Sequence, residues 1–354
     1  MMCFFVLLTE VYIKVFQSKS LLLNTLTKEI VILDKAQLSL AIALEKHRYI
    51  EANSLPKYLH DKLRSFGYYL NAKKAPFVLQ PYCHVVSSLE RFRNATGMLD
   101  GKNILGYVNK IRFHFPNTCD TDILVNLFYF DKDEIYNSGG EYINAYKKFL
   151  NTFPLSYHIS IELLGIFSKA MYDFMNYLIN KGITFFAKCI VNSQEDIEKI
   201  IHLDNNSFCA MIFAKYSDII RPKYNDNIVI FHLSEIALSS STEKTKSSCE
   251  IIKLSGSISD IAKNRIINSG LYGSIDVCAD NLIRCTKQHI GRILEFDTAF
   301  YNWINSSNCI WYHIRAKKNK CCDCLLQDIC PPITCSELTN EETIFCGSKH
   351  YPMF

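Results

Sequence analysis

The segment HISIELL, at His158–Leu164, is an apolar run of the kind that forms a buried β-strand. It is followed by the amphipathic segment KAMYDFMNYLI at Lys169–Ile179 and then by TFFAKCIV, a second strand-like run, at Thr184–Val191. Strand, helix and strand in this order predict two parallel strands joined by a covering helix, because parallel neighbours require a crossover connection.

The same alternation continues on both sides of this unit. Further strands are predicted at Ile111–Phe115, Leu124–Phe130, Ala210–Ala214 and Ile228–His232, and further helices at Glu141–Leu150 and Gln194–His202. The middle of the chain is therefore expected to form a largely parallel α/β sheet. Its periodicity leaves open whether the sheet closes into a barrel.

The N-terminal segment has a different pattern. Strands are predicted at Phe4–Leu8, Val11–Phe16, Leu21–Asn24 and Ile30–Leu33, and helices at Lys35–Glu45 and Leu55–Tyr69, with Gly67 as a stop. Short strands followed by short helices predict a winged-helix-like module at residues 1–75.

Near the C-terminus the pattern changes again. Residues 239–250, rich in Ser, Thr and Lys, are expected to be a surface loop, and short strands are predicted at Gly273–Val277 and Leu282–Cys285 before a helix that reaches Trp303. We expect three domains, at residues 1–75, 76–265 and 266–354.

Composition limits the class of protein. The chain has 354 residues, 49% of them apolar, and a net charge of +4, so it is expected to be globular with no strong case for nucleic acid binding. Its 15 cysteines do not indicate a disulfide scaffold, because such scaffolds are short and secreted and this chain is expected to be neither, so we expect most to be reduced and buried. No signal peptide and no run of eighteen apolar residues is found, so a cytoplasmic location without membrane contact is expected.

Four cysteines in the tail form the strongest chemical pattern: Cys321, Cys324, Cys330 and Cys346. Two residues separate the first pair, five the next and fifteen the last, and Pro331-Pro332 directs the chain away after Cys330. Four thiolates brought together select zinc or an iron–sulfur cluster over hard cations. The spacing therefore predicts one metal centre in the tail.

Other residues near the tail leave alternatives open. Cys322 is adjacent to Cys321, but the two-residue gap to Cys324 favours Cys321 as the ligand. Additional candidates are Cys285, Cys335, His313 and His350, which are expected to be structural neighbours rather than ligands. The acidic run Asp131–Glu134 lacks the other ligands of a calcium loop and is expected to be a solvated turn.

The tail resembles the C-terminal SPASM-type region of the pseudo-radical-SAM proteins of Bacteroidales peptide-modification systems. The matching residues are Trp311, Arg315, Cys321, Cys324, Leu326-Gln327, Cys330-Pro331-Pro332, Glu337 and Cys346. Weaker similarity lies at Leu22–Leu26, at Gly273–Asp280 and at Ile290-Gly291.

This resemblance implies a degenerate partial (β/α) barrel of the radical SAM type, with a winged-helix-like module before it and a small SPASM-like domain after it. True radical SAM enzymes bind their cluster through Cys-x-x-x-Cys-x-x-Cys, which occurs nowhere in this chain. S-adenosylmethionine is therefore not expected. The four tail cysteines would hold an auxiliary [4Fe–4S] cluster or, alternatively, zinc.

The function that the resemblance implies is that of a non-catalytic accessory protein in the maturation of a ribosomally made peptide. Its partners would be the precursor peptide, a radical SAM maturase, or both, and the peptide would add as a strand to the N-terminal sheet. Two alternatives stay open from the sequence: an iron–sulfur enzyme that uses the tail cluster, and a zinc-binding interaction protein.

Overall fold

The structure, a computed structural model, describes residues 1–79, 104–128, 130–136, 142–153, 159–203, 207–216, 227–233, 248–319, 321–334 and 337–338. The chain divides into two compact units. The first comprises Met1–Gly97, Glu243–Tyr272 and Trp311–Phe354, and the second comprises Met98–Thr242 and Gly273–Ile310.

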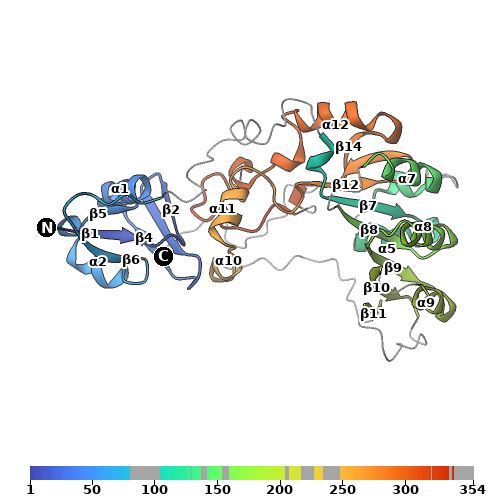
Figure 1. Ribbon diagram of the computed structural model, residues 1–354, viewed down its shortest axis with the longest axis horizontal. Helices are drawn as coiled ribbons and strands as arrows, with labels where there is room; N and C mark the ends of the chain where they lie inside the picture. The colour runs from blue at the N-terminus through green and yellow to red at the C-terminus, as the bar shows by residue number, and fades with distance from the viewer. Residues whose placement is uncertain are drawn as a thin grey trace. The chain divides into compact units, whose positions relative to one another are not determined.

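An eight-stranded sheet in the order β11-β10-β9-β8-β7-β12-β13-β14 forms the second unit (Figure 1). Strands β7 to β12 pair in parallel, and β13 and β14 add in antiparallel fashion. The bounds are β7 Lys110–Phe115, β8 Ser160–Ile166, β9 Phe185–Val191, β10 Phe208–Ala214, β11 Ile228–His232, β12 Ser274–Val277, β13 Leu282–Cys285 and β14 Gln288–Arg292. The predicted α/β class with a largely parallel sheet is confirmed.

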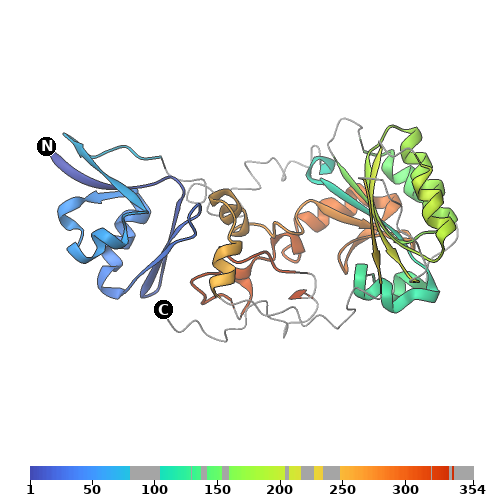
Figure 2. The same cartoon turned by 90° about the horizontal axis from the view of Figure 1, so that it is seen from below.

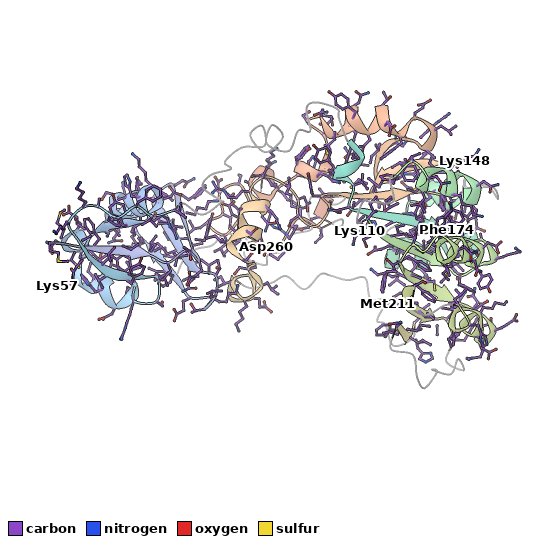
Figure 3. All side chains as sticks on the ribbon, in the orientation of Figure 1. Lys57, Lys110, Lys148, Phe174, Met211 and Asp260 are labelled. Atoms are coloured by element: carbon purple, nitrogen blue, oxygen red, sulfur yellow. The ribbon has the colours of Figure 1, made fainter. Side chains whose placement is uncertain are left out.

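Helices follow the parallel strands as crossover connections. They are α5 Thr121–Phe128, α6 Lys132–Tyr136, α7 Tyr142–Leu150, α8 Lys169–Asn180 and α9 Gln194–Ile201, with α12 Phe296–Ile304 after β14. Figure 2 shows α8 and α9 along one face of the sheet. There the ring of Phe113 on β7 lies 5.0 Å from that of Tyr146 on α7 and 4.9 Å from that of Phe174 on α8, which Figure 3 labels.

One predicted strand of this region is wrong. Residues Thr121–Phe128 form helix α5, whereas a strand was predicted at Leu124–Phe130. The run is short and apolar, so its periodicity fits either structure. Leu124 and Phe128 are four residues apart, and both pack into one buried cluster with Leu164 and Phe213, which a helix permits.

Gly165 is required by the pairing of β7 with β8. Its φ of +135° belongs to a region that residues with a side chain rarely adopt, and a Cβ there would collide with the carbonyl of Phe115. Gly182, after α8, also has a positive φ, of +68°, but open space surrounds it.

Gly165→Ala is expected to destabilise the second unit by roughly 3 kcal/mol or more, because strain and a backbone clash add. Gly182→Ala, the matched control, is expected to cost about 1 kcal/mol. Urea denaturation followed by tryptophan fluorescence and circular dichroism measures both. Equal costs at the two positions would contradict the assigned clash.

Two three-stranded antiparallel sheets lie in the N-terminal part of the first unit, in the orders β5-β1-β6 and β2-β3-β4. The elements are β1 Met2–Leu7, β2 Val11–Phe16, β3 Lys19–Asn24, β4 Ile30–Leu33, α1 Leu38–His47, β5 Tyr49–Glu51, α2 Lys57–Lys62 and β6 Gly67–Ala72. Side chains from both sheets and both helices share one core, which includes Phe5, Ile13, Leu44 and Leu59.

The predicted helix at Leu55–Tyr69 is too long. Helix α2 ends at Lys62, and residues from Gly67 onward form β6, which pairs with β1 from Gly67 to Ala72. Because β1 lies some sixty residues earlier in the chain, this pairing is not encoded in local periodicity. A Cβ at Gly67 would collide with the carbonyl of Val6, so glycine permits the close approach.

Two further helices of the first unit cover the sheet β2-β3-β4: α10 Ser248–Leu254 and α11 Ile258–Asn264. Ile251 and Ile261 pack in one cluster with Tyr12, Leu21 and Leu326. The surface loop predicted at residues 239–250 is wrong for 248–250, which begin α10, and its remainder lies outside the described residues. Within the described ranges, no helix is both long and apolar enough to cross a membrane.

Candidate functional site

The first two tail cysteines lie in a tight turn. The backbone N–H of Cys324 donates to the carbonyl of Cys321 at 3.0 Å. The backbone N–H of Cys321 donates in turn to the carbonyl of Lys318 at 2.7 Å. The N–H of Leu326 points at the Cys324 sulfur, 3.4 Å away. Such N–H groups stabilise a thiolate, and hydrogen bonds to the sulfurs tune iron–sulfur sites. The turn therefore suits metal ligation by these thiols.

Cys330 is buried, and Arg315 holds the chain on its C-terminal side. The guanidinium donates to the carbonyls of Pro331, at 2.5 Å, and Pro332, at 3.2 Å, and forms a bidentate pair with Glu337 with both distances 3.0 Å. Burial opposes the charged form of Arg315, but Glu337 outweighs this and raises the pKa of the guanidinium. Arg315 and Glu337 are 5% and 2% exposed, so the pair is a buried ionic contact.

Gln327 connects the cysteine turn to the N-terminal sheet. With its amide oxygen facing the Lys14 ammonium at 2.5 Å, its nitrogen donates to the carbonyls of Cys321 and Cys322 at 2.9 and 3.1 Å. This orientation is assigned from the hydrogen-bond pattern. One buried side chain thus holds the carbonyls of both Cys321 and Cys322.

Asp328 attaches the tail to β2. Its Oδ2 accepts from the hydroxyl of Tyr12 at 2.7 Å and from Lys14 Nζ at 2.9 Å, and Arg265 Nε lies 3.8 Å away. Burial lowers the pKa of Lys14, although Asp328 partly offsets this. Asp328 is itself 5% exposed, so the tail and the sheet β2-β3-β4 share a buried polar contact.

The remaining candidates of the tail have varied positions. Cys322 is partly exposed, and its thiol donates to the carbonyl of Asn319 at 3.2 Å. Burial, with Lys317 nearby, lowers the pKa of His313. Cys285 is buried in β13 of the second unit. Outside the described residues lie Cys335, Cys346 and His350, so the fourth predicted ligand stays a prediction.

A second polar region lies on the face of the sheet opposite α7 and α8. Alternate residues of β7 present Lys110, Arg112 and His114 there, because side chains alternate across a strand. Lys110 pairs with Glu162 of β8 at 3.0 Å, and Arg112 pairs with Asp276 of β12 at 2.6 Å. These charged groups share one face of three neighbouring strands.

His114 is the centre of a buried cluster on this face. Its Nδ1 lies 2.9 and 3.1 Å from the two carboxylate oxygens of Glu134 on α6, and 3.9 Å from the sulfur of Cys278. Its Nε2 lies 3.2 Å from Asp276 Oδ1. The ring of Phe130 stacks on the imidazole, with centroids 4.1 Å apart.

Protonation follows from these neighbours. Burial opposes the imidazolium form of His114, but Glu134, Cys278 and Asp276 outweigh it and hold the pKa well above its ordinary value. Burial raises the pKa of the Cys278 thiol to about 12. The neighbours of His114 therefore favour its imidazolium form, and burial favours the neutral thiol of Cys278.

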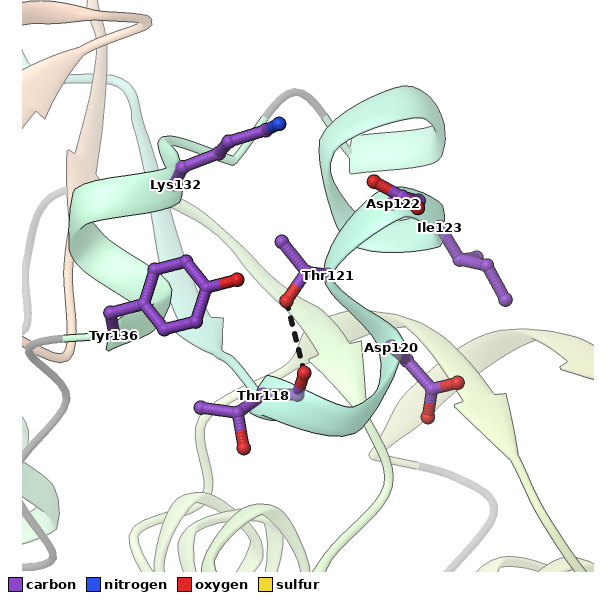
Figure 4. Close-up of a pocket in the computed structure, with 7 residues that line it drawn as sticks. All are labelled: Thr118, Asp120, Thr121, Asp122, Ile123, Lys132 and Tyr136. Carbon is purple, nitrogen blue, oxygen red and sulfur yellow. Dashed lines mark hydrogen bonds between the residues drawn. The ribbon is translucent and has the colours of Figure 1, made fainter.

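A polar hollow of about 430 Å³ opens beside α6 (Figure 4). Thr118, Asp120 and Thr121 form one wall, and Lys132 and Tyr136 of α6 form the other. Asp120 is engaged by Lys215, whose Nζ lies 2.6 Å from Oδ1. The hollow thus lies next to the helix that carries Glu134.

Sequence reasoning missed the His114 cluster. Residues Asp131–Glu134 were expected to be a solvated turn, but Lys132–Tyr136 is helical and Glu134 is 1% exposed. Within its own segment nothing distinguishes Glu134 from the neighbouring acids. In the sequence, only Arg112 and His114 could have indicated this cluster, because they are basic residues within the strand predicted at Ile111–Phe115.

Comparisons with known proteins give weak similarity. No protein-family model matches the chain, and no curated protein matches it. Streptococcus suis SuiB bound to S-adenosylmethionine aligns over 98% of this chain and 99% of its own, with 13% identity and a TM-score of 0.28. SuiB bound to the precursor peptide SuiA aligns over 95% and 97%, with 13% identity and a TM-score of 0.27. Scores this low establish neither a shared fold nor a shared activity.

Proposed function

We propose that this protein is a non-catalytic accessory protein in the maturation of a ribosomally made peptide, and that it acts in the cytoplasm. It binds the precursor peptide, a partner radical SAM maturase, or both. Residues 1–75 are the peptide-recognition module of winged-helix type, 76–265 a degenerate partial barrel, and 266–354 a SPASM-like metal domain.

The observation that carries the proposal is the network around Arg315. The tail motif gives Arg315, Cys330-Pro331-Pro332 and Glu337 as separate matches, and in the folded chain these residues contact one another directly. The guanidinium of Arg315 supplies hydrogen-bond donors to the backbone carbonyls of both Pro331 and Pro332. The residues that the tail motif matches are thus linked to one another by hydrogen bonds in this chain, and this supports the proposal.

The metal centre of the proposal is an auxiliary [4Fe–4S] cluster or zinc held by Cys321, Cys324, Cys330 and Cys346. The turn at Cys321–Cys324 and the N–H directed at the Cys324 sulfur fit a thiolate-bound metal. In this proposal the metal is a scaffold: it fixes the loop that carries Gln327 and Asp328, which contact β2.

Peptide binding is proposed at β4. This strand is at one edge of the sheet β2-β3-β4, where its paired neighbour is β3. An edge strand offers unpaired N–H and C=O groups, and an extended peptide can add to them as a further strand. Its side chains Ile30, Val31 and Ile32 are partly buried, so the main chain would be the recognition element.

The test is hydrogen exchange on the full chain with a candidate precursor peptide, taken from a short reading frame if one lies beside its gene. Added peptide is expected to slow amide exchange at Ile30–Leu33 and to leave β5 and β6, in the other N-terminal sheet, unchanged. A scrambled peptide of the same composition is the control. Protection elsewhere, or none at saturating peptide, would refute the β4 site.

Catalysis is tested with the same preparation. Protein purified without oxygen is analysed for iron, sulfide and zinc and is then incubated with S-adenosylmethionine and a reductant. Cleavage above the rate of a metal-free sample would overturn the non-catalytic assignment. Recovery of neither a peptide nor a maturase in pull-down would favour a zinc-binding interaction protein instead.

A further inference from the structure

We propose that His114, Glu134 and Cys278 together bind a zinc ion in the second unit. The nitrogen, oxygen and sulfur donors of these three residues all lie within 4.8 Å of one another, and all three residues are buried. They come from three separate segments: β7, α6 and the turn that follows β12. This site does not depend on the proposed role in peptide maturation.

The distances are close to those of a zinc shell. Tetrahedral zinc with bonds of about 2.0 Å to nitrogen and oxygen and about 2.3 Å to sulfur separates N from O by about 3.3 Å and N from S by about 3.6 Å. Here Nδ1 of His114 lies 2.9 Å from Glu134 and 3.9 Å from Cys278. For these two pairs, shifts of a few tenths of an ångström are enough to reach the zinc values, and one position of the shell is left for a water.

The donor types select the metal. Calcium and magnesium prefer sets made only of oxygen, whereas an imidazole, a carboxylate and a thiolate suit zinc. Carboxylates alone would not distinguish zinc from calcium or magnesium. The thiolate of Cys278 is a soft ligand and therefore favours zinc over these hard cations.

Polar contacts through Asp276 orient the imidazole of His114. Metal-bound histidines usually donate their other N–H to a carboxylate, and Nε2 of His114 faces Asp276 at 3.2 Å. Asp276 is held in turn by Arg112, whose Nη2 lies 3.0 Å from Oδ2, and by the backbone N–H of Thr286 at 2.8 Å. This leaves Nδ1 directed at Glu134 and Cys278, as ligation requires.

Ion pairs surround the proposed ligands. Arg112 pairs with Asp276, and Arg284 pairs with Asp280. Zinc would take the imidazole of His114 as a neutral ligand and Cys278 as a thiolate, since metal ligands must be deprotonated.

The position in the sheet also suits a ligand. From β7 the chain adds β8, β9, β10 and β11 on one side, and β12 then pairs with the other side of β7. His114 is near the carboxyl end of β7, and Cys278 directly follows β12, its parallel neighbour. In open α/β sheets, ligands bind outside the carboxyl ends of strands where the strand order reverses.

The test uses the full chain with Cys324→Ser and Cys330→Ser, so that the tail contributes no bound zinc. Metal is removed with a chelator in the presence of a reductant, and the metal-free protein is then titrated with zinc. A single zinc ion per chain is expected, and cobalt in its place is expected to give four-coordinate d–d bands with a thiolate charge-transfer band. Cys278→Ser is expected to abolish that band and to weaken zinc binding at least about 100-fold, and Asp276→Asn to weaken it about 10- to 100-fold.

Cys189→Ser is the matched control, because Cys189 is also a fully buried cysteine of the same sheet. It is expected to keep both the zinc and the cobalt spectrum. If the double tail variant does not fold, the natural tail is used, and Cys278→Ser should then hold one zinc fewer than Cys189→Ser. Equal zinc content, or a cobalt spectrum without sulfur charge transfer, would overturn the site.

Discussion

Cys330→Ser is expected to abolish metal binding by the tail and to destabilise the segment from Trp311 to Leu338. Metal bound at a structural site contributes directly to folding, with apparent binding energies of about 10–16 kcal/mol for structural zinc. Cys330 is also buried at 7% exposure among Leu326, Ile329 and the side chains of α11, so the loss of ligation opens a core contact as well.

Metal analysis and amide exchange at residues 311–334 measure this effect. Cys324→Ser provides a second ligand variant, and because Cys324 is only partly buried its loss of metal carries less loss of packing. Cys189→Ser, in β9, tests whether any buried cysteine gives the same result. Unchanged metal content in Cys330→Ser would show the ligand assignment to be wrong.

The parallel sheet was predictable because each strand and its crossover helix are local patterns. The runs at Ile111–Phe115, Thr184–Val191 and Ile228–His232 became β7, β9 and β11, and the helix at Lys169–Ile179 became α8. Each is long or apolar enough to be identified within its own window. Segments that failed, such as Leu124–Phe130 and Leu55–Tyr69, take their structure from partners distant in the sequence.

The two candidate sites differ in how far apart their residues lie in the sequence. The tail motif places three of its cysteines within ten residues, so their spacing is visible in the sequence. His114, Glu134 and Cys278 span more than 160 residues. The pairing of β12 with β7 brings Cys278 to His114, and Glu134 comes from helix α6. No periodicity or spacing encodes such a contact, and Glu134 was accordingly expected to face solvent.

Arg315→Gln is expected to destabilise the tail by about 3–5 kcal/mol, the usual cost of breaking a buried ion pair by removing one partner. The variant leaves the Glu337 carboxylate, with no exposed side-chain surface, without its countercharge. It also removes the donors to the carbonyls of Pro331 and Pro332. Arg315→Lys, which keeps the charge but not the planar fork, is expected to give an intermediate loss.

Local opening of the tail is the suitable measurement, because a chain with two units need not unfold in one step. In metal-free protein the rate at which a small alkylating reagent modifies Cys330 reports that opening. Arg315→Gln is expected to raise this rate roughly 100- to 4000-fold, at about tenfold for each 1.4 kcal/mol. Lys169→Gln, which removes an exposed partner of Asp173, should leave the rate unchanged. Equal rates in Arg315→Gln and Lys169→Gln would mean that the Arg315 network has no part in positioning Cys330.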